Sequence, residues 1–370
     1  MKNKLTVRSP GRINLIGEHT DYNMGFVLPA AIDKAIEFTI EPTTGSMIEL
    51  TATDLNETVE ISPKYNVKSG IEWVNYCAGI IDQLTQKNSR IAPFKCSFGG
   101  NIPLGAGLSS SAALSCGFLM AINEFFELGL SKVEIALMAQ SSENDFVGVS
   151  CGIMDQYACI FGEKDALIKI DCRSLEHETI KGDFDGYSLL LCDTKVKHSL
   201  ASTAYNTRKI ECEAGVKAIQ AKNRNVKSLR DANLKDLEEV RSSISQDVYD
   251  RCEFVINENN RVLAAIKAIK NKDMKLLGSF MFQSHEGLKN KYKVSCTELD
   301  ILADFAKKHP AVVGARMMGG GFGGCTINLI KSKGLDSFKT TAASHYKLKT
   351  GKEATFYDIK ISDGASKLYY

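Results

Sequence analysis

The residues most able to do chemistry lie in segment 11–22, which reads GRINLIGEHTDY. It places Arg12, two carboxylates (Glu18 and Asp21) and the imidazole of His19 around an apolar strand fragment, with glycines on both sides. A buried strand would end in so many polar residues only where a ligand needs several hydrogen bonds. Carboxylates accept hydrogen bonds from sugar hydroxyls, and arginine pairs with anions. The segment therefore predicts a site for a polyhydroxylated ligand beside a phosphate.

A second, glycine-rich segment lies between an apolar strand candidate and an alanine-rich helix candidate. Glycines let backbone N–H groups approach anionic oxygens, and the start of a helix favours phosphate. The segment lacks the lysine of a Walker A loop. An ordinary turn with a serine-capped helix is the alternative, but three consecutive serines favour phosphate. The residues predicted to cradle phosphate are Gly105, Ala106, Gly107, Leu108, Ser109, Ser110 and Ser111.

A single acid, Asp155, interrupts the otherwise uncharged run 147–162. An isolated buried carboxylate is costly, so this one must be paired or functional. The alternative is an aspartate that caps a helix or forms a turn. We therefore keep Asp155 as a candidate catalytic residue.

A third segment, 319–324, has the spacing G-x-G-x-x-G that is typical of dinucleotide-binding turns. No acidic residue follows about twenty positions later, and too little chain remains for a dinucleotide-binding fold. We therefore assign no dinucleotide to this segment.

The size and composition of the chain indicate a soluble cytoplasmic protein with two domains. A chain of 370 residues, of which 44% are hydrophobic, can bury a large core. Its net charge is +2 and no run of lysine and arginine forms a basic stripe, so we expect no nucleic-acid partner. Eleven cysteines lie singly, without a Cys-x-x-Cys pair, which favours reduced thiols over disulfides or a zinc site. No apolar run suits a signal peptide or a membrane span.

Hydrophobic periodicity predicts mixed strands and helices first, and mostly helices from about residue 190 to 290. The clearest helix is 247–270, where apolar residues recur at spacings of three and four and Asn259 interrupts the series. We place the domain boundary near residue 190, which gives domains 1–190 and 191–370. The other predicted helices are 72–87, 109–127, 131–145 and 334–348, and the predicted strands are 33–42, 48–53, 94–100, 187–192, 312–317, 325–330 and 355–361.

Three motifs of this sequence together resemble those of the GHMP family of small-molecule kinases. They are GRINLIGEHTDY at 11–22, PLGAGLSSSAA at 103–113 and MGGGFGGC at 318–325. The second and third are shared by GHMP kinases in general, whereas the first is narrower and resembles the signature of galactokinases. The resemblance runs from near residue 5 to near residue 362. It implies an α+β fold with a ribosomal-S5-like N-terminal domain, a ferredoxin-like C-terminal domain and the active site between them.

The resemblance also implies a reaction, in which the γ-phosphate of ATP passes to the C1 hydroxyl of galactose with Mg²⁺ present. Asp155 would take or orient the hydroxyl proton, while Arg12 would keep Asp155 ionised and stabilise the transferring phosphoryl group. Residues 105–111 would wrap the ATP phosphates, and Ser111 and Glu143 would bind the metal. For Glu143, a solvated carboxylate at a helix end is the alternative. The residues assigned to the sugar are Glu18, His19, Asp21, Gly152 and Tyr205.

Two aromatic residues have weaker assignments. Trp73, the only tryptophan, matches a family residue near the adenine, and Tyr205 matches one that contacts the sugar. Either could instead be an ordinary core residue. Where some relatives have a serine near the nucleotide, this chain reads LTATD at 50–54, so we assign no ATP contact there.

Two other functions stay open at this point. One is a GHMP kinase for another sugar, such as N-acetylgalactosamine or arabinose. The other is a galactose sensor that binds ATP and sugar but signals through a partner. Sensors of this fold lack part of the serine-alanine stretch, which is whole at 109–113 and favours catalysis. We expect galactose and ATP as partners, no membrane partner, and a monomer.

Overall fold

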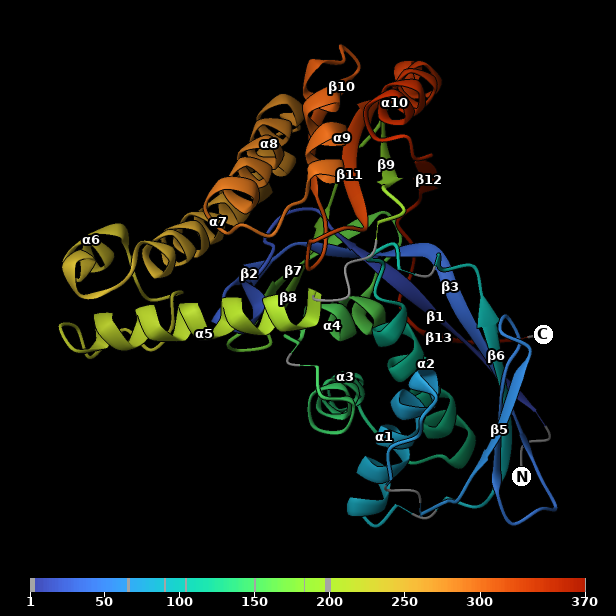
Figure 1. Ribbon diagram of the computed structural model, residues 1–370. Helices are drawn as coiled ribbons and strands as arrows, with labels where there is room; N and C mark the ends of the chain where they lie inside the picture. Colours follow the sequence, from blue (N-terminus) through green and yellow to red (C-terminus); the bar gives the residue numbers. More distant parts are fainter. Residues whose placement is uncertain are drawn as a thin grey trace.

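The computed structural model describes residues 4–64, 67–89, 91–103, 105–149, 151–182, 184–196 and 201–369, with only the backbone described for 201–203. Figure 1 shows two groups of strands with helices packed on them, and a separate arm of helices that projects to one side. Among the described residues, no helix has both the length and the apolar character needed to cross a membrane.

The first half is built on a six-stranded sheet with the order β13-β1-β3-β6-β4-β5. The pairing of β4 with β6 is parallel, and the other strand pairs of this sheet are antiparallel. Its strands are β1 (Leu5–Asn14), β3 (Pro29–Pro42), β4 (Ile48–Ala52), β5 (Glu57–Ile61), β6 (Phe94–Gly100) and β13 (Ser366–Leu368).

Four helices cover this sheet and bury its apolar face. Helices α2 (Ser110–Phe126) and α4 (Met154–Phe161) pack directly on β1 and β3. Helices α1 (Glu72–Gln86) and α3 (Lys132–Ser141) pack in turn against α2. A small sheet of β2 (Phe26–Val27), β7 (Ala166–Asp171) and β8 (His177–Lys181) completes the first half. The end of β1 and the start of α4, which carry the predicted catalytic residues, are therefore neighbours in space.

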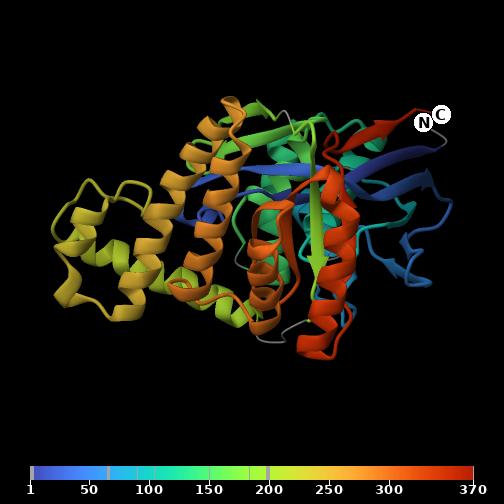
Figure 2. The ribbon, with the colours of Figure 1, turned by 90° about the horizontal axis from the view of Figure 1, so that it is seen from above.

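The second half contains a four-stranded antiparallel sheet with the order β10-β11-β9-β12. Its strands are β9 (Tyr187–Asp193), β10 (Val312–Met317), β11 (Cys325–Lys331) and β12 (Thr355–Ile359). Helices α8 (Met274–Asn290) and α9 (Thr297–Lys308) pack on β10, and α10 (Leu335–Thr350) packs on α9. The arm consists of α5 (Ala201–Gln220), α6 (Leu234–Glu238) and α7 (Gln246–Lys270), and Figure 2 shows it extending away from both sheets.

The structure contains elements that the sequence analysis did not predict or bounded differently, among them β1, β13 and the turn that follows α3. The domain boundary near residue 190 stays a prediction, and residue 190 itself lies within β9, a strand of the second sheet. The last strand, β13, returns to pair with β1, so the first and last described strands lie side by side in one sheet. This return covers an edge of β1 that would otherwise be unpaired. The predicted helix 131–145 ends at Ser141 and continues as a π-helical turn, Ser142–Val147.

Candidate active site

Most of the residues predicted for catalysis and sugar binding line one cavity of about 250 Å³. The cavity lies where the end of β1, the start of α4 and the glycine-rich turn between β10 and β11 meet. Its walls therefore come from both halves of the chain. From the predicted set, the lining residues are Arg12, Glu18, His19, Asp21, Ser111, Glu143, Gly152, Asp155 and Tyr205.

The carboxylate of Asp155 is held by a bidentate ion pair with Arg12. Arg12 Nε donates to Oδ1 and Nη2 donates to Oδ2, each over 2.8 Å. Burial lowers the pKa of Arg12, but the adjacent Asp155 carboxylate outweighs this and raises the pKa above its usual value. The third nitrogen, Nη1, donates to the Gly107 carbonyl over 2.6 Å. Arg12 thus fixes both the carboxylate and the glycine-rich loop.

Ser109 also donates a hydrogen bond to Asp155, through its hydroxyl to Oδ2. We predicted that Ser109 would contact ATP phosphates, whereas in this structure its side chain is committed to the carboxylate. Oδ2 therefore has two donors and Oδ1 has one, that from Arg12. A carboxylate oxygen has about two acceptor sites. Oδ1 is thus the oxygen with capacity for a substrate hydroxyl.

Glu18 is buried, and one of its oxygens is already occupied by protein donors. Oε1 accepts from the Gly319 backbone N–H over 2.7 Å and from Arg316 Nη2 over 3.1 Å. Sequence reasoning missed Arg316. The only signal was an arginine inside an apolar strand, directly before the third glycine-rich motif. The Glu18 carboxylate is therefore held by donors from the second half of the chain.

Asp21 packs so closely on Gly152 that a side chain at position 152 would not fit. A Cβ atom on Gly152 would lie 2.0 Å from Asp21 Oδ2. Burial first, and then the nearby Asp155 carboxylate, raise the pKa of Asp21 to about 7. A group in this state is half protonated near neutral pH, which is typical of functional sites. The sequence predicted both residues for the sugar, and the structure brings them into contact.

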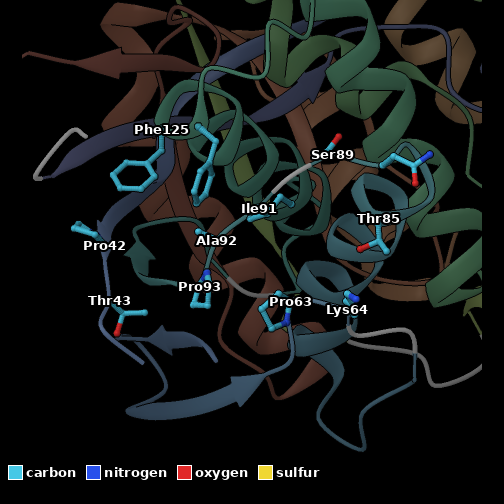
Figure 3. A pocket seen from close by; sticks show the side chains of 12 residues that line it. Pro42, Thr43, Pro63, Lys64, Thr85, Ser89, Ile91, Ala92, Pro93 and Phe125 are labelled. Atoms are coloured by element: carbon cyan, nitrogen blue, oxygen red, sulfur yellow. The ribbon is translucent and has the colours of Figure 1, made fainter. Parts of the chain in front are cut away.

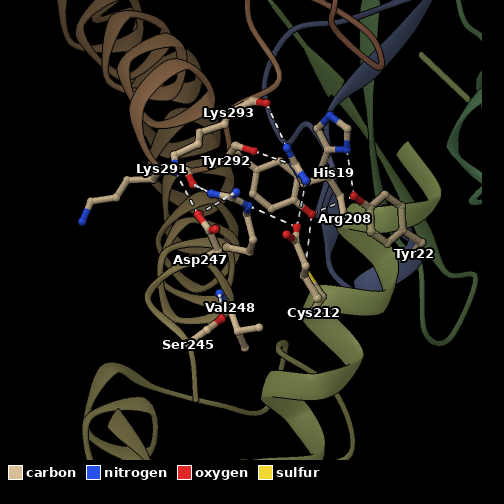
Figure 4. Close-up of polar contacts among 12 residues, drawn as sticks. His19, Tyr22, Arg208, Cys212, Ser245, Asp247, Val248, Lys291, Tyr292 and Lys293 are labelled. Atoms are coloured by element: carbon tan, nitrogen blue, oxygen red, sulfur yellow. Dashed lines mark hydrogen bonds and ion pairs between the residues drawn. The ribbon is translucent and has the colours of Figure 1, made fainter. Parts of the chain in front are cut away.

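His19 lines the cavity, but its ring also belongs to a buried series of hydrogen bonds with two tyrosine hydroxyls (Figure 4). Its Nδ1 is 2.8 Å from the Tyr22 hydroxyl, which is 2.7 Å from the Tyr292 hydroxyl. Burial lowers the pKa of His19 to about 3, so the ring is neutral at physiological pH. The rings of His19 and Tyr205 lie 5.4 Å apart. The contact of His19 with a sugar therefore stays a prediction, and its ring also has a structural role.

The glycine-rich segment 105–111 leads into α2 and includes its first two residues. The side chains of Ala106 and Leu108 are buried in the core, so only their backbone can face a phosphate. Ser109, the residue before α2, does not cap the helix with its side chain. The first N–H groups of α2 are therefore free of a side-chain cap, as a phosphate site at a helix N-terminus requires.

A second cavity, of about 600 Å³, lies on the other side of this loop. Ser110 and Trp73 line it, and Trp73 Nε1 donates to Glu57 Oε2 over 2.6 Å. Ala52 and Asp54 line it too, although we assigned no nucleotide contact to residues 50–54. Ser111 lines both this cavity and the sugar-sized one. The two cavities therefore meet at the phosphate loop, which is the arrangement that transfer between two bound substrates needs.

Glu143 lies on the π-helical turn, a local geometry often found at functional sites. Its Oε1 accepts from Gln156 Nε2 over 2.9 Å, and Ser111 lines the same cavity. Burial raises the pKa of Glu143 to about 7, although Ser111 acts to lower it. No lysine or arginine in the described part of the chain forms an ion pair with this carboxylate. A buried acid with a hydroxyl beside it and no cationic partner fits a hard divalent cation.

A third cavity, of about 900 Å³, is elsewhere, near the far ends of α1 and α2 (Figure 3). Prolines and phenylalanines form much of its wall, with Lys64 as the charged residue among them. Its described lining includes neither a carboxylate nor a histidine. It therefore lacks the carboxylates and the imidazole that line the smaller cavity, and we do not take it as the candidate active site.

Comparisons with known proteins agree with this geometry. The family model for the GHMP kinase N-terminal domain matches residues 75–163, and that for the C-terminal domain matches residues 265–346. The fold and the paired cavities at the glycine-rich loop thus define a GHMP kinase, an ATP-dependent small-molecule kinase with the expected α+β fold. The model for the galactokinase galactose-binding signature matches residues 2–42. The chain belongs to the galactokinase family.

Individual relatives are similar over nearly the whole chain. The galactokinase of Thermotoga maritima is 39% identical over 98% of this chain and 100% of its own length. That of Clostridium acetobutylicum is 37% identical over 97% of this chain and 94% of its own. The crystal structure of Lactococcus lactis galactokinase complexed with galactose superposes with a TM-score of 0.95. It is 33% identical and covers 99% of this chain and 96% of that one.

Proposed function

We propose that this protein transfers the γ-phosphoryl group of ATP to the C1 hydroxyl of α-D-galactose, giving galactose 1-phosphate and ADP. The observation that carries the proposal is the position of Ser111, which lines both the sugar-sized cavity and the larger cavity beside Trp73. A sugar in the first and a nucleotide in the second would meet at the phosphate loop. Galactose is the sugar that the family membership favours.

Asp155 acts on the sugar hydroxyl through Oδ1. The C1 oxygen attacks the γ-phosphorus, a new oxygen–phosphorus bond forms, and the bond to the β-phosphate oxygen of ADP breaks. The hydroxyl proton passes to Oδ1 or is oriented by it. Arg12, paired with Asp155 over 2.8 Å, orients the carboxylate and adds positive charge beside the transferred group. Because phosphoryl transfer depends mostly on positioning and electrostatics, these two residues are sufficient for the chemical step.

Sugar recognition belongs to the polar groups around Asp155. Asp21 accepts from the axial C4 hydroxyl, and Glu18 accepts at the C6 end of the ring. Gly152 offers its backbone, since any side chain there would collide with Asp21. His19 and Tyr205 complete the wall. The nucleotide faces the backbone of residues 105–111, with Trp73 beside its base.

Mg²⁺ fits Glu143 and Ser111, since both offer oxygen atoms to the phosphate side of the cavity. When bound, the cation would neutralise charge on the phosphates. Glu143 provides its carboxylate in ionised form above a pH of about 7, because burial raises its pKa to that value. Gln156, which donates to Glu143 over 2.9 Å, fixes the orientation of the carboxylate.

We expect Ser111→Ala and Glu143→Ala each to raise the Mg²⁺ concentration needed for half-maximal activity. Each change removes an oxygen ligand from a cation that demands near-ideal geometry. The measurement is a Mg²⁺ titration of activity at saturating galactose and ATP, with the galactose KM determined alongside. Asp145→Ala is a suitable control, because this exposed acid lies on the same π-helical turn. Unchanged titrations for both variants would remove these residues from the metal site.

The proposed reaction is tested by coupling ADP formation to a spectroscopic assay with a panel of hexoses. Galactose should be the preferred substrate. Preference for N-acetylgalactosamine or arabinose would support the alternative GHMP kinase, and binding of galactose and ATP without ADP formation would support a sensor. The complete Ser-Ser-Ser-Ala-Ala stretch at 109–113 favours an enzyme.

We further propose a cytoplasmic monomer whose ligands are small molecules. All eleven cysteines are free thiols, and most are buried, which suits a reducing compartment. Both cavities are built from one chain, so a single subunit can hold both substrates. A net charge of +2 gives no reason to expect a nucleic-acid partner.

A further inference from the structure

The segment that carries the sugar residues is held by two buried, oppositely charged side chains from the second half of the chain. They are Arg316 on β10 and Glu258 on α7, and the side chain of each has an exposed fraction of 0%. Neither belongs to the motifs that predicted the site. Charged residues are almost never fully buried unless they are paired, so each needs a reason to be there.

Arg316 donates hydrogen bonds to acceptors of this segment. Its Nε donates to the Leu15 carbonyl over 2.9 Å, and its Nη2 donates to the Asn14 carbonyl. The same Nη2 reaches Glu18 Oε1 over 3.1 Å, while Nη1 donates to the Met317 carbonyl over 2.7 Å. The guanidinium thus joins the end of β1 to the sugar-facing carboxylate. An ammonium group, with a single nitrogen, cannot span these acceptors.

Glu258 accepts a hydrogen bond from a backbone N–H of the same segment. Its Oε1 accepts from the Gly17 backbone N–H over 3.0 Å and from the Ser284 hydroxyl over 2.7 Å. Its Oε2 accepts from Arg261 Nε over 2.7 Å. Gly17 has φ +98°, and a Cβ atom there would lie 2.8 Å from Val262, so the chain turns tightly against α7. The next residue, Asn259, accepts from the Phe26 backbone N–H over 2.9 Å.

The two contacts are complementary and lie on either side of the same short turn. Beyond the end of β1 at Asn14, the Leu15 N–H and the Ile16 carbonyl still pair with the backbone of Leu28, whereas the Leu15 carbonyl and the Gly17 N–H need other partners. Arg316 satisfies carbonyls before the turn, and Glu258 satisfies an N–H within it. Glu18 follows directly. No hydrogen bond from the described part of the chain reaches its Oε2, while its Oε1 is occupied by Arg316 and Gly319.

We propose that Arg316 and Glu258 are positioning residues that set galactose affinity by fixing the backbone from Asn14 to Glu18 and leaving Glu18 Oε2 for the sugar. This inference rests on the proposed role of Glu18 at the C6 end of galactose. Loosening either contact allows Glu18 to rotate, so the hydrogen bond to the C6 hydroxyl is lost. Sugar affinity therefore depends on the second half of the chain, as well as on the signature motif.

The test uses Arg316→Lys, which keeps the positive charge but not the fork of donors, and Glu258→Met, which keeps side-chain length but removes the acceptors. Each should raise the galactose KM by about tenfold, while the ATP KM changes by less than about twofold. The decisive readout is the ratio of kcat/KM for galactose to that for 6-deoxygalactose. This ratio should fall towards one in both variants, because the contact to the C6 hydroxyl is already lost. Arg316→Lys should add little to Glu18→Gln in a double-mutant cycle.

The matched control is Arg251→Lys. Arg251 is also buried and donates to Glu211, Asp247 and the Lys291 carbonyl, and within the described part of the chain none of its hydrogen bonds goes to residues 14–18. It should lower the melting temperature without changing the ratio between the two sugars. The proposal is wrong if Arg316→Lys behaves like this control. It is also wrong if the effects of Arg316→Lys and Glu18→Gln on kcat/KM for galactose multiply fully in the double variant. If Arg316→Lys does not fold, Glu258→Met decides in the same way. A wild-type ratio near one would instead refute the role of Glu18, and inactivity towards galactose would refute the proposed reaction.

Discussion

Replacing Asp155 with asparagine should lower kcat for galactose by roughly 10²–10⁴-fold, the usual cost of losing a general base, while galactose still binds. The amide keeps the shape of the carboxylate but cannot accept a proton or carry negative charge. It also places an N–H group opposite Arg12, whose Nε and Nη2 both donate to Asp155 in the native protein. Arg12 would then lose its negatively charged partner, although the cavity would keep its size.

The measurement combines steady-state kinetics with calorimetric titration of galactose into the variant. Asp145→Asn is the control, because it makes the same change at an exposed acid. If Asp155→Asn binds no galactose, Asp155 is a specificity residue and the proposed catalytic role is wrong. If kcat is preserved, the proton does not pass through this carboxylate.

Replacing Asp21 with alanine should lower kcat/KM for galactose steeply and narrow the gap between galactose and glucose. The two sugars differ in the direction of the C4 hydroxyl, so apolar area cannot distinguish them. Discrimination needs a polar group that pairs with the axial hydroxyl. A site built in this way can reject an analogue that lacks the contact by roughly 10⁴-fold. The wild-type enzyme should therefore phosphorylate galactose and barely accept glucose.

Kinetics with both sugars test this assignment. If Asp21→Ala keeps the full preference for galactose, Asp21 does not read the C4 hydroxyl. If the wild-type enzyme prefers glucose, the proposed reaction itself fails. Asp21→Asn is the companion variant, because it keeps the contact with Gly152 and removes only the charge.

The raised pKa of Asp21 also gives this site a pH dependence. With a pKa of about 7, compared with 3.8 as its ordinary value, the folded protein holds a proton that the unfolded chain has lost between these two pH values. Stability therefore falls as pH rises through this window. Asp21→Asn should melt at a higher temperature than the wild type at pH 8, although it is impaired as an enzyme. In the wild type, the galactose KM should rise as pH falls below about 7. A lower melting temperature for Asp21→Asn would contradict this prediction, because it would mean that other groups compensate the negative charge of Asp21 in the folded protein.

Local patterns were sufficient to predict much of the fold and to select residues that line one cavity in the structure. The helix 247–270 and the strand 94–100 were predicted within a residue of α7 and β6, because periodic burial is a local property. The π-helical turn at 142–147 was missed, since its hydrogen-bond pattern depends on packing against α1. The break in the apolar series at Asn259 was visible, but its reason was not. The Phe26 N–H that Asn259 binds lies 233 positions earlier in the chain.

By itself, the sequence determined which residue types could do the chemistry. Glu18, Asp21 and Asp155 were identified from composition, spacing and family resemblance, and residues 105–111 from the properties of glycine and serine. Only the tertiary structure decided how each group is used. It directs the Ser109 hydroxyl to Asp155 and the His19 ring to Tyr22. It also brings Arg316 to Glu18, because hydrogen bonds between side chains so far apart in the chain depend on how β1, α7 and β10 pack together.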